Sequence, residues 1–455
     1  MAITICLVGI AGPGLWADEL ATWGITAVSW SEFWLQLEGT DASIGAYYVI
    51  VRAWVTVFGD SDLALRAPSA IAMAATAAIV AITAKRIGST RAGLVAGLIF
   101  AILPTTSRFG QEARPYAMAT LAAAVATLLL VRMLERFTLG IALAYVAALT
   151  ALGYLHLVAM LILAAHGLAV LLVKPKLLWR WTPTVFGALV LIAPLVLVGR
   201  QQQGNQIDWI PFADLNQLEA FPNDFFGSAL VGGAVMVLGA SAVSRTRGPL
   251  VAASLAVLPT ALLFALGTFA HLWQQRYVLF TLVGWTLLAG LALARRGRAA
   301  CVAAVSVLAL IAIPGHLNVR EPAYRLQDTA AVVALLRESY WPGDGIVYGL
   351  QDRGPGVLNR DILAHYLPAD RQPKDLLVDR PMRTDGWMVA SEHQDVAARL
   401  GDTRRIWVLR LGDYGDPLEG LDGTKTQVLG ERYTITETWH TTGYTVALLT
   451  RKTPA

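Results

Sequence analysis

The sequence predicts an all-helical membrane domain that crosses the bilayer many times, followed by a small α/β domain outside the membrane. The 455 residues are 56% hydrophobic and only 15% charged, whereas soluble domains carry about 25% charged residues. The apolar residues form successive long segments up to about residue 314, after which the chain turns polar. A bilayer accepts helices of about 20 apolar residues. We therefore expect a membrane domain over 1–314 and a separate domain over 315–455, which is long enough for its own core.

We predict eleven membrane helices, at approximately 2–15, 64–86, 91–105, 115–134, 139–156, 157–173, 182–199, 228–244, 248–270, 277–294 and 299–314. The first segment is short and is interrupted by Gly12 and Pro13. A signal peptide is the alternative there, because Leu15-Trp16-Ala17 is a tolerable cleavage site. No basic residue precedes the segment, and this favours a membrane helix.

The net charge of +4 and the pI near 9.1 do not indicate nucleic-acid binding, because the basic residues sit in short clusters at every second connection between apolar segments. The clusters are Lys85, Arg86 and Arg91; Arg132 and Arg136; Lys174, Lys176 and Arg180; Arg245 and Arg247; Arg295, Arg296 and Arg298. Basic connections face the cytoplasm in an inner membrane. The N-terminus is then inside, and residues 16–63, 106–114, 200–227, 271–276 and the tail lie outside.

The loop over 16–63 is rich in tryptophan and tyrosine, which concentrate at bilayer interfaces. We expect parts of it to lie on the membrane as amphipathic helices. An aromatic belt is one interpretation of these rings. A sugar pocket near Asp18, with Trp16 among its walls, is the other.

In the tail, the apolar pattern predicts a helix over 328–339 and buried strands at 345–348 and 405–409. A hairpin is predicted over 433–451, with its turn at Thr441-Thr442-Gly443. The two cysteines, Cys6 and Cys301, lie in separate apolar segments and are expected to remain unpaired.

Asp18 and Glu19 are adjacent carboxylates at the outer end of the first apolar segment, where acidic residues are costly and are often functional. Neighbouring residues in a helix face different directions, so the two make a poor glycosidase pair. One carboxylate that acts as a base, together with several arginines, fits this chain better. A structural role, keeping the helix end in water, is the alternative for both carboxylates.

The segment Gln111-Glu112-Ala113-Arg114-Pro115-Tyr116 occupies a predicted outward turn, with Pro115 starting the next helix. Arg114 would lie near the first turn of that helix, close to the membrane surface, and is our first candidate for a ligand of an anion. Arg66 and Arg108 are further candidates. Glu112 is expected to pair with Arg114, contact the sugar or bind a metal.

A second outward turn, His271-Leu272-Trp273-Gln274-Gln275-Arg276-Tyr277, places Arg276 and Tyr277 on the same predicted face. Arg276 would bind the phosphate or the sugar, or simply anchor the helix at the interface. His271 is a weak candidate metal ligand. His156 and His166 lie on or near apolar helices and are interpreted as core or interface residues.

These motifs, together with Arg66-Ala67-Pro68-Ser69 and Trp16-Ala17-Asp18-Glu19-Leu20-Ala21-Thr22, resemble the GT-C glycosyltransferases. Closest is the branch of the protein O-mannosyltransferases and the aminoarabinose transferases of lipid A. The resemblance covers the first third of the chain in motifs and the rest in hydropathy. It implies a transferase that takes a sugar from a polyprenyl-phosphate carrier, with Asp18 as the base toward the acceptor. Glu19 would orient the acceptor or help to hold a divalent metal, which some relatives need.

The resemblance implies that Gln111, Glu112, Tyr116 and Tyr277 contact sugar or acceptor, while Arg114, Arg66, Arg108 and Arg276 bind the donor phosphate. Relatives often carry a His-Pro-Pro-Leu-Tyr-Tyr-like stretch in the first outer loop. Here residues 41–48 read Asp-Ala-Ser-Ile-Gly-Ala-Tyr-Tyr, which retains only Tyr47 and Tyr48. Asp41 is a candidate for the lost polar group. The departure leaves the donor sugar and the acceptor undecided.

The leading hypothesis is an inverting glycosyltransferase of the inner membrane, active on the outer face, with mannose as the sugar and an envelope glycolipid, glycan or protein as acceptor. An arabinofuranosyl or other pentose donor is the nearest rival. A lipid or sugar transporter or flippase would place charges in mid-helix and show matched halves, and this chain does neither. A non-catalytic envelope subunit is the third alternative. No cofactor is required by the motifs, and a divalent metal (Glu19, Glu112 or His271 as ligands) is left open.

Overall fold

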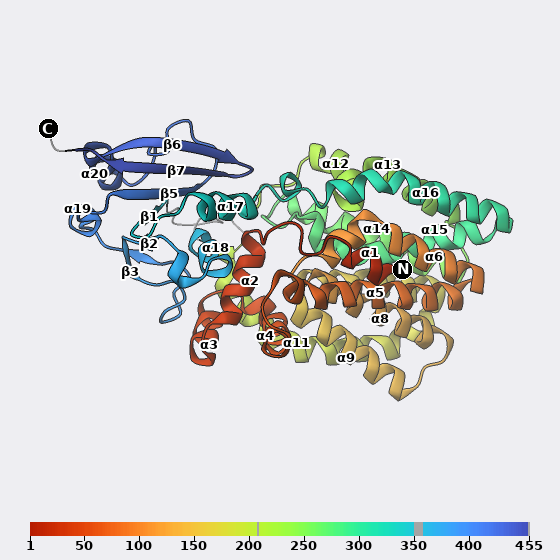
Figure 1. Ribbon diagram of the computed structural model, residues 1–455. Helices are drawn as coiled ribbons and strands as arrows, with labels where there is room; N and C mark the ends of the chain where they lie inside the picture. Colours follow the sequence, from red (N-terminus) through yellow and green to blue (C-terminus); the bar gives the residue numbers. More distant parts are fainter. Residues whose placement is uncertain (207–208, 350–357, 454–455) are drawn as a thin grey trace. The chain divides into compact units, whose positions relative to one another are not determined.

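The computed structural model describes residues 1–206, 209–349 and 358–453. The chain divides into two compact units (Figure 1). The helical unit comprises Met1–Ile10 and Thr40–Val319, and the sheet unit comprises Ala11–Gly39 and Arg320–Ala455. The predicted boundary at 314/315 lies inside the last helix of the helical unit, and the two-domain division stays a prediction. Residues 11–39 make their contacts with the C-terminal segment.

The helical unit contains these elements: α1 (Ala2–Leu7), η1 (Ala42–Ile44), α4 (Gly45–Phe58), α5 (Asp62–Ile87), α6 (Thr90–Ile102), α7 (Pro104–Gly110), α8 (Tyr116–Glu135), α9 (Leu139–Leu155), η2 (Leu157–Leu161), α10 (Ile162–Val173), η3 (Pro175–Leu177), α11 (Leu178–Gln206), α12 (Leu215–Phe226), α13 (Ala229–Ala242), α14 (Arg247–Gly267), η4 (Gln275–Thr281), α15 (Leu282–Ala294) and α16 (Arg298–Asn318).

Small residues let the central helices of this unit pack closely. α5 packs against α6 and α8, and α15 packs against α6, α13 and α14. A Cβ added at Gly93 of α6 would lie 2.6 Å from the Ala81 carbonyl oxygen, and one added at Gly290 of α15 would lie 2.6 Å from Ala96 Cβ. Because lipid provides no hydrophobic drive between helices, such close backbone contact is a main source of association.

Among the described residues, six helices are long and apolar enough to cross a membrane, or up to eight if two bent pairs each form one span. The bent pairs are α6 with α7 (62°) and α12 with α13 (93°). Three shorter apolar helices cover Ala42–Phe58, Leu139–Leu155 and Leu157–Val173. The predicted segments from 64–86 onward all coincide with helices. The number of eleven crossings stays a prediction, while the many apolar helices confirm the fold class.

The first predicted segment differs from the structure. Residues 2–15 were expected to form one helix, but α1 ends at Leu7 and Val8 is already extended. Gly9 adopts a positive φ of 72°, which a helix does not permit, and Gly12 and Pro13 prevent resumption. The predicted outer loop over 16–63, in which we expected amphipathic helices, contains α2, α3 and α4, and the sequence did not predict the bounds of the apolar helix α4.

The sheet unit contains α2 (Ala17–Ala27), α3 (Trp30–Gly39), η5 (Pro322–Arg325), α17 (Thr329–Ser339), β1 (Gly345–Tyr348), α18 (Asn359–Tyr366), η7 (Ala369–Arg371), β2 (Lys374–Asp375), β3 (Val378–Arg380), β4 (Ser391–Glu392), α19 (Val396–Leu400), β5 (Arg405–Leu411), α20 (Gly423–Arg432), β6 (Tyr433–Thr441) and β7 (Tyr444–Arg451).

A five-stranded mixed sheet with the order β2-β1-β5-β7-β6 forms the centre of this unit. β1 runs parallel to β2 and β5, whereas β7 is antiparallel to both β5 and β6. β5 reads Arg-Ile-Trp-Val-Leu-Arg-Leu and is buried through its five middle residues, as a central strand with both faces covered should be. Burial raises the pKa of the Tyr444 phenol at the start of β7.

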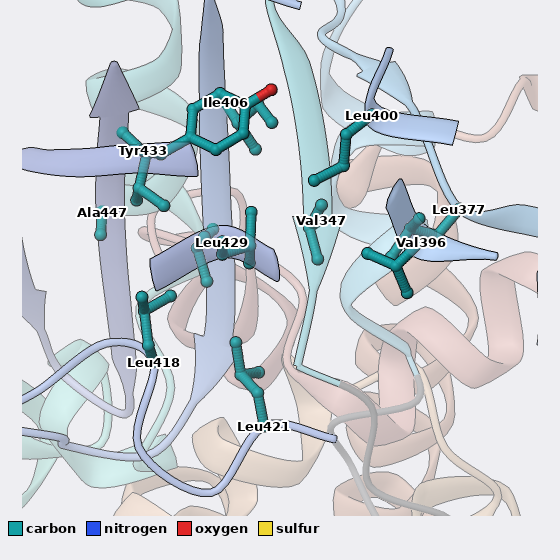
Figure 2. Packing of buried hydrophobic residues seen from close by; sticks show 12 residues of the cluster. Val347, Leu377, Val396, Leu400, Ile406, Leu418, Leu421, Leu429, Tyr433 and Ala447 are labelled. Atoms are coloured by element: carbon teal, nitrogen blue, oxygen red, sulfur yellow. The ribbon is translucent and has the colours of Figure 1, made fainter. Parts of the chain in front are cut away.

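Alternate residues of the strands form a single apolar cluster under α19 and α20. Val347, Ile406 and Ala447 point into it from three neighbouring strands, and Leu400 and Leu429 come from the two helices (Figure 2). The period-2 spacing of Ile406 and Val408 places both on this face. On the opposite face Trp407 is fully buried, stacks on Trp439 with centroids 5.6 Å apart, and donates Nε1–H to Asp344 at 2.9 Å.

The predicted elements of the tail are confirmed. α17 begins after Asp328, whose carboxylate accepts the Ala331 N–H at 2.9 Å as an N-cap. β1, β5 and the β6–β7 hairpin lie where the pattern placed them. The hairpin turn needs Gly443, because its φ is +81° and an added Cβ would lie 2.1 Å from the Leu326 carbonyl oxygen.

Candidate functional site

The predicted site residues fall in both units, and each group is described within its own unit. Trp16, Asp18 and Glu19 belong to the sheet unit. Arg66, Arg108, Arg114 and Arg276 belong to the helical unit, together with Gln111, Glu112, Tyr47, Tyr48, Tyr116, Tyr277 and His271.

Asp18 and Glu19 stand in the first turn of α2, where negative charge complements the helix dipole. Trp16 is the N-cap residue, and the Ala17 N–H donates to Gln327 Oε1 at 2.8 Å, which ties the helix start to the C-terminal segment. Asp18 is half-buried, whereas Glu19 is completely buried. The two carboxylates therefore occupy different environments, as their consecutive helix positions require.

Glu19 forms a buried ion pair with Arg325, whose Nη1 lies 2.7 Å from Glu19 Oε2. The side chains are 0% and 1% exposed. A charge removed from water to this degree needs its partner. This geometry supports a positioning role for Glu19 and favours Asp18 as the carboxylate that meets substrate.

The turn between α7 and α8 is also built on buried polar contacts. Gln111 Nε2 donates to the carbonyl oxygens of Cys6 at 2.9 Å and of Val8 at 2.6 Å. Glu112 is 1% exposed and forms an ion pair with Arg108, one helical turn before it. Pairing with Arg114 was one of three expectations for Glu112, beside contact with the sugar and metal binding. The structure gives Glu112 a partner in Arg108, and this favours a structural role for that arginine.

Arg114 takes part in a polar chain that reaches the segment over residues 41–48. Its Nη1 donates to the Tyr48 hydroxyl at 3.3 Å, and that hydroxyl donates to Asp41 Oδ2 at 2.8 Å. Tyr47 packs beside Tyr48 with ring centroids 5.9 Å apart, and both are buried. The suggestion that Asp41 supplies a polar group to this loop is consistent with the contact.

Arg66 is completely buried in α5, and its Nη1 donates to the Ile10 carbonyl oxygen at 2.7 Å. It therefore helps to hold the segment that follows α1. This contact favours an anchoring role over direct contact with a ligand.

Arg276 lies among aromatic rings. Its guanidinium carbon is 5.7 Å from the centroids of Tyr116 and Trp209 and 6.0 Å from that of Tyr277. Such faces attract a cation and fix its direction. A small cavity beside it is lined by Tyr116, Tyr277, Arg276 and His156. Two motifs that are far apart in the sequence thus share one cavity.

His156 and Trp209 were not predicted as site residues. His156 was interpreted as a core or interface residue because it lies at the end of an apolar helix. Its position at a break between two helices was the one feature of the sequence that could have indicated a site residue. His166, interpreted in the same way, is confirmed as core: its Nε2 bonds to Thr127 Oγ1 at 3.2 Å and its Nδ1 to Tyr145 Oη at 2.8 Å.

Metal candidates were Glu19, Glu112 and His271. His271 Nδ1 bonds to the Ile210 carbonyl oxygen, and its ring packs on Phe212 at 4.2 Å. Across residues 1–206, 209–349 and 358–453, no three His, Cys, Asp or Glu side chains are grouped to hold an ion. The donor sets that the structure describes do not fit a metal centre. Cys6 and Cys301 are buried free thiols, as expected.

The sheet unit has a second charged cluster, which the sequence did not reveal. Arg360 bridges Asp375 at 2.6 Å and Glu392 at 2.7 Å, and Lys425 pairs with Glu392. Two cations and two anions balance one another. Burial and the nearby Asp375 carboxylate raise the pKa of Tyr348, over whose ring Arg360 lies. The balance of charge favours a structural role.

Comparison with known proteins identifies the class. Residues 42–198 match the family model described as dolichyl-phosphate-mannose-protein mannosyltransferase. The fold matches ArnT from Cupriavidus metallidurans in the apo state, with a TM-score of 0.65, 14% identity, and coverage of 98% of this chain and 96% of that one. The structure of the same protein bound to undecaprenyl phosphate matches with a TM-score of 0.63, 13% identity and the same coverage. No curated protein matched the sequence.

These matches confirm the resemblance predicted from the motifs. The chain is an integral membrane protein that shares the GT-C fold of ArnT, with a helical membrane part and a small C-terminal sheet domain.

The Glu19–Arg325 pair yields a first prediction. Replacing Arg325→Met leaves a carboxylate buried without its cation, which typically costs about 3–5 kcal/mol. The double variant Arg325→Met with Glu19→Gln should be markedly more stable than Arg325→Met alone. Thermal unfolding of the purified full-length protein measures both.

The control is the exposed pair of Arg451 and Asp402, whose atoms lie 2.9 Å apart. Arg451→Met should barely change the melting temperature, because exposed pairs contribute little. A double variant as unstable as Arg325→Met alone would contradict the structural role of Glu19.

Proposed function

We propose that the protein is an inverting glycosyltransferase that uses a polyprenyl-phosphate sugar as donor. The observation that carries the proposal is an aromatic-lined cavity of the helical unit that Arg276 lines, and at which the charge of Arg114 acts on His156. ArnT, whose fold it shares, has been crystallised with undecaprenyl phosphate. Two arginines from separate turns suit a lipid phosphate, since guanidinium groups bind phosphate oxygens bidentately.

The proposed transfer reaction requires one base and several cations. The acceptor hydroxyl oxygen attacks the anomeric carbon as the bond from that carbon to the phosphate oxygen breaks. Asp18 accepts the hydroxyl proton. The phosphate departs with the bonding electrons, and Arg114 and Arg276 stabilise its growing charge. A phosphodiester is a weak base, so no acid is needed to protonate it. A single displacement of this kind inverts the anomeric centre.

Among the other predicted ligands, Tyr116, Tyr277, Tyr47, Tyr48 and Trp16 are assigned to sugar and acceptor. The remaining residues are assigned to supporting roles, since each has a buried polar contact that holds the surrounding backbone or side chains: Arg66, Arg108, Gln111, Glu112 and Glu19.

We propose mannose as the sugar, supported by the description of the matching family model. The rival is an arabinofuranosyl or other pentose donor. The acceptor is an envelope glycolipid, glycan or protein. Transfer assays with purified enzyme and a panel of polyprenyl-phosphate sugars test the donor: transfer from the pentosyl but not the mannosyl lipid would replace the first choice with the second.

The proposed orientation places residues 16–63 and the tail outside and Lys174, Arg245 and Arg295 inside, because the basic clusters alternate along the chain. Single cysteines introduced at these positions test it with a membrane-impermeant maleimide on intact cells. The two native thiols are buried and give a low background. Labelling of Arg245→Cys or Arg295→Cys from outside would reverse the topology.

The base assignment predicts the effect of Asp18→Asn. This change keeps the size of the side chain and removes its capacity to accept a proton, so kcat should fall about 100-fold or more. Binding of the donor lipid should change little, because the phosphate is assigned to the arginines. Single-turnover transfer and donor affinity measure the two effects separately. A fully active Asp18→Asn enzyme would return the role to Glu19 or Glu112.

Arg114 provides the donor-side prediction. Arg114→Ala should weaken donor affinity and turnover together, by roughly tenfold or more for a charged hydrogen-bonding group. Arg114→Lys should recover part, because it keeps the charge and loses the fork. Tyr48→Phe is the matched control, since it removes the 3.3 Å bond to Arg114 and leaves the guanidinium.

If Arg114 acts only by holding Tyr48, the two single variants will have equal effects. If it is a phosphate ligand, Arg114→Ala will be the more severe. Isothermal titration with undecaprenyl phosphate distinguishes these results.

A further inference from the structure

His156 occupies a break between two helices of the helical unit. It follows α9 and precedes η2, with extended backbone angles of −162° and 100°. The imidazole packs against Tyr116, with ring centroids 5.5 Å apart, and edge-on against Tyr277 at 5.1 Å. It is 8% exposed and lines the small cavity beside Arg276.

One nitrogen of the ring has no hydrogen-bond partner on another residue of the described chain. His156 Nδ1 is buried, and no other residue in the described part of the chain is its hydrogen-bond partner. A buried polar atom without a partner is costly and uncommon. His166, the other histidine of this helix pair, has both ring nitrogens bonded. The comparison separates a core histidine, with both nitrogens bonded to other residues, from one that lines a cavity and has a ring nitrogen without such a partner.

Positive charge converges on the same place. Arg276 lines the cavity with His156, and the charges of both Arg276 and Arg114 act on the imidazole. Two guanidinium groups favour an anion as the ligand. Thr120 and the two tyrosines complete the polar lining. An imidazole N–H in that position can donate to an anionic oxygen, and such charge-assisted bonds are the strong ones.

We infer that His156 is a further binding residue for the donor lipid, its imidazole N–H donating to an oxygen of the phosphate. This inference rests on the proposed function and deepens it: the phosphate is held by two arginines and one neutral donor that the motifs did not indicate. Tyr116 and Tyr277 hold the imidazole between them and so position its N–H group.

The test is the affinity of the full-length protein in nanodiscs for three probes: undecaprenyl phosphate, its mannosyl derivative and undecaprenol, which lacks the phosphate. His156→Phe keeps a ring between the tyrosines and removes both nitrogens. It should weaken binding of the two phosphate-containing lipids by about tenfold and leave undecaprenol unchanged. His156→Asn, which restores an N–H donor near the position of Nδ1, should recover most of the loss.

His166→Phe is the matched control, because it removes a buried histidine of the same helix pair that has no place at the cavity. It should lower the melting temperature and leave the affinity of the folded protein for undecaprenyl phosphate unchanged. If His156→Phe does not fold, His156→Leu is measured by the same criteria.

Equal binding of undecaprenyl phosphate by wild type and His156→Phe would overturn the inference, and so would a loss confined to the mannosyl lipid or an equal loss with undecaprenol. In those cases the Arg276→Ala variant tests the proposed function separately from the role of His156. Loss of phosphate binding in Arg276→Ala leaves the proposed function standing without His156. A wild-type protein that does not distinguish undecaprenyl phosphate from undecaprenol removes both.

Discussion

A charge removed from water must be met by another polar group, and this constraint governs the arrangement of the site. Glu112 has Arg108, Glu19 has Arg325, and Arg66 has the carbonyl oxygen of Ile10. Each of these contacts uses a polar residue to stabilise the fold. Arginines of this chain therefore lie in different surroundings: Arg66 and Arg108 stabilise the turns, whereas Arg276 lies among aromatic rings and lines a small cavity.

The predictions from the sequence that succeeded are those that did not depend on finding a partner for a buried charge. Long apolar segments and the 2-residue period of the tail depend on local pattern, and these predicted α17, β1, β5 and the β6–β7 hairpin. Failures occurred where glycine and proline interrupted a pattern, as at α1, or where strands of two or three residues left no period to detect, as in β2, β3 and β4. α4 was hidden by its position between polar residues in what was interpreted as a loop.

The site could be predicted by residue type but not by partnership. The motifs named Arg108, Glu112 and Arg114 together, yet only the three-dimensional structure shows that Glu112 has Arg108 as a partner. Glu19 and Arg325 are 306 residues apart, and no local pattern connects them. For the same reason residues 11–39 could not be assigned to the sheet unit: Gly24 leaves room there for the Arg383 side chain, which binds Asp361 through two hydrogen bonds of 2.8 and 2.7 Å.

Arg276 lies against aromatic rings, whereas Arg325 is paired with the carboxylate of Glu19. The faces of Tyr116, Trp209 and Tyr277 attract the cation through their quadrupoles and fix the direction of its guanidinium group. Arg276 also lines the small cavity with Tyr116 and Tyr277. An anion that enters beside it meets a preorganised cation with little reorganisation of the protein. This protein therefore stabilises buried or partly buried charge in two ways: with aromatic rings around Arg276 and with ion pairs such as that of Glu19 with Arg325.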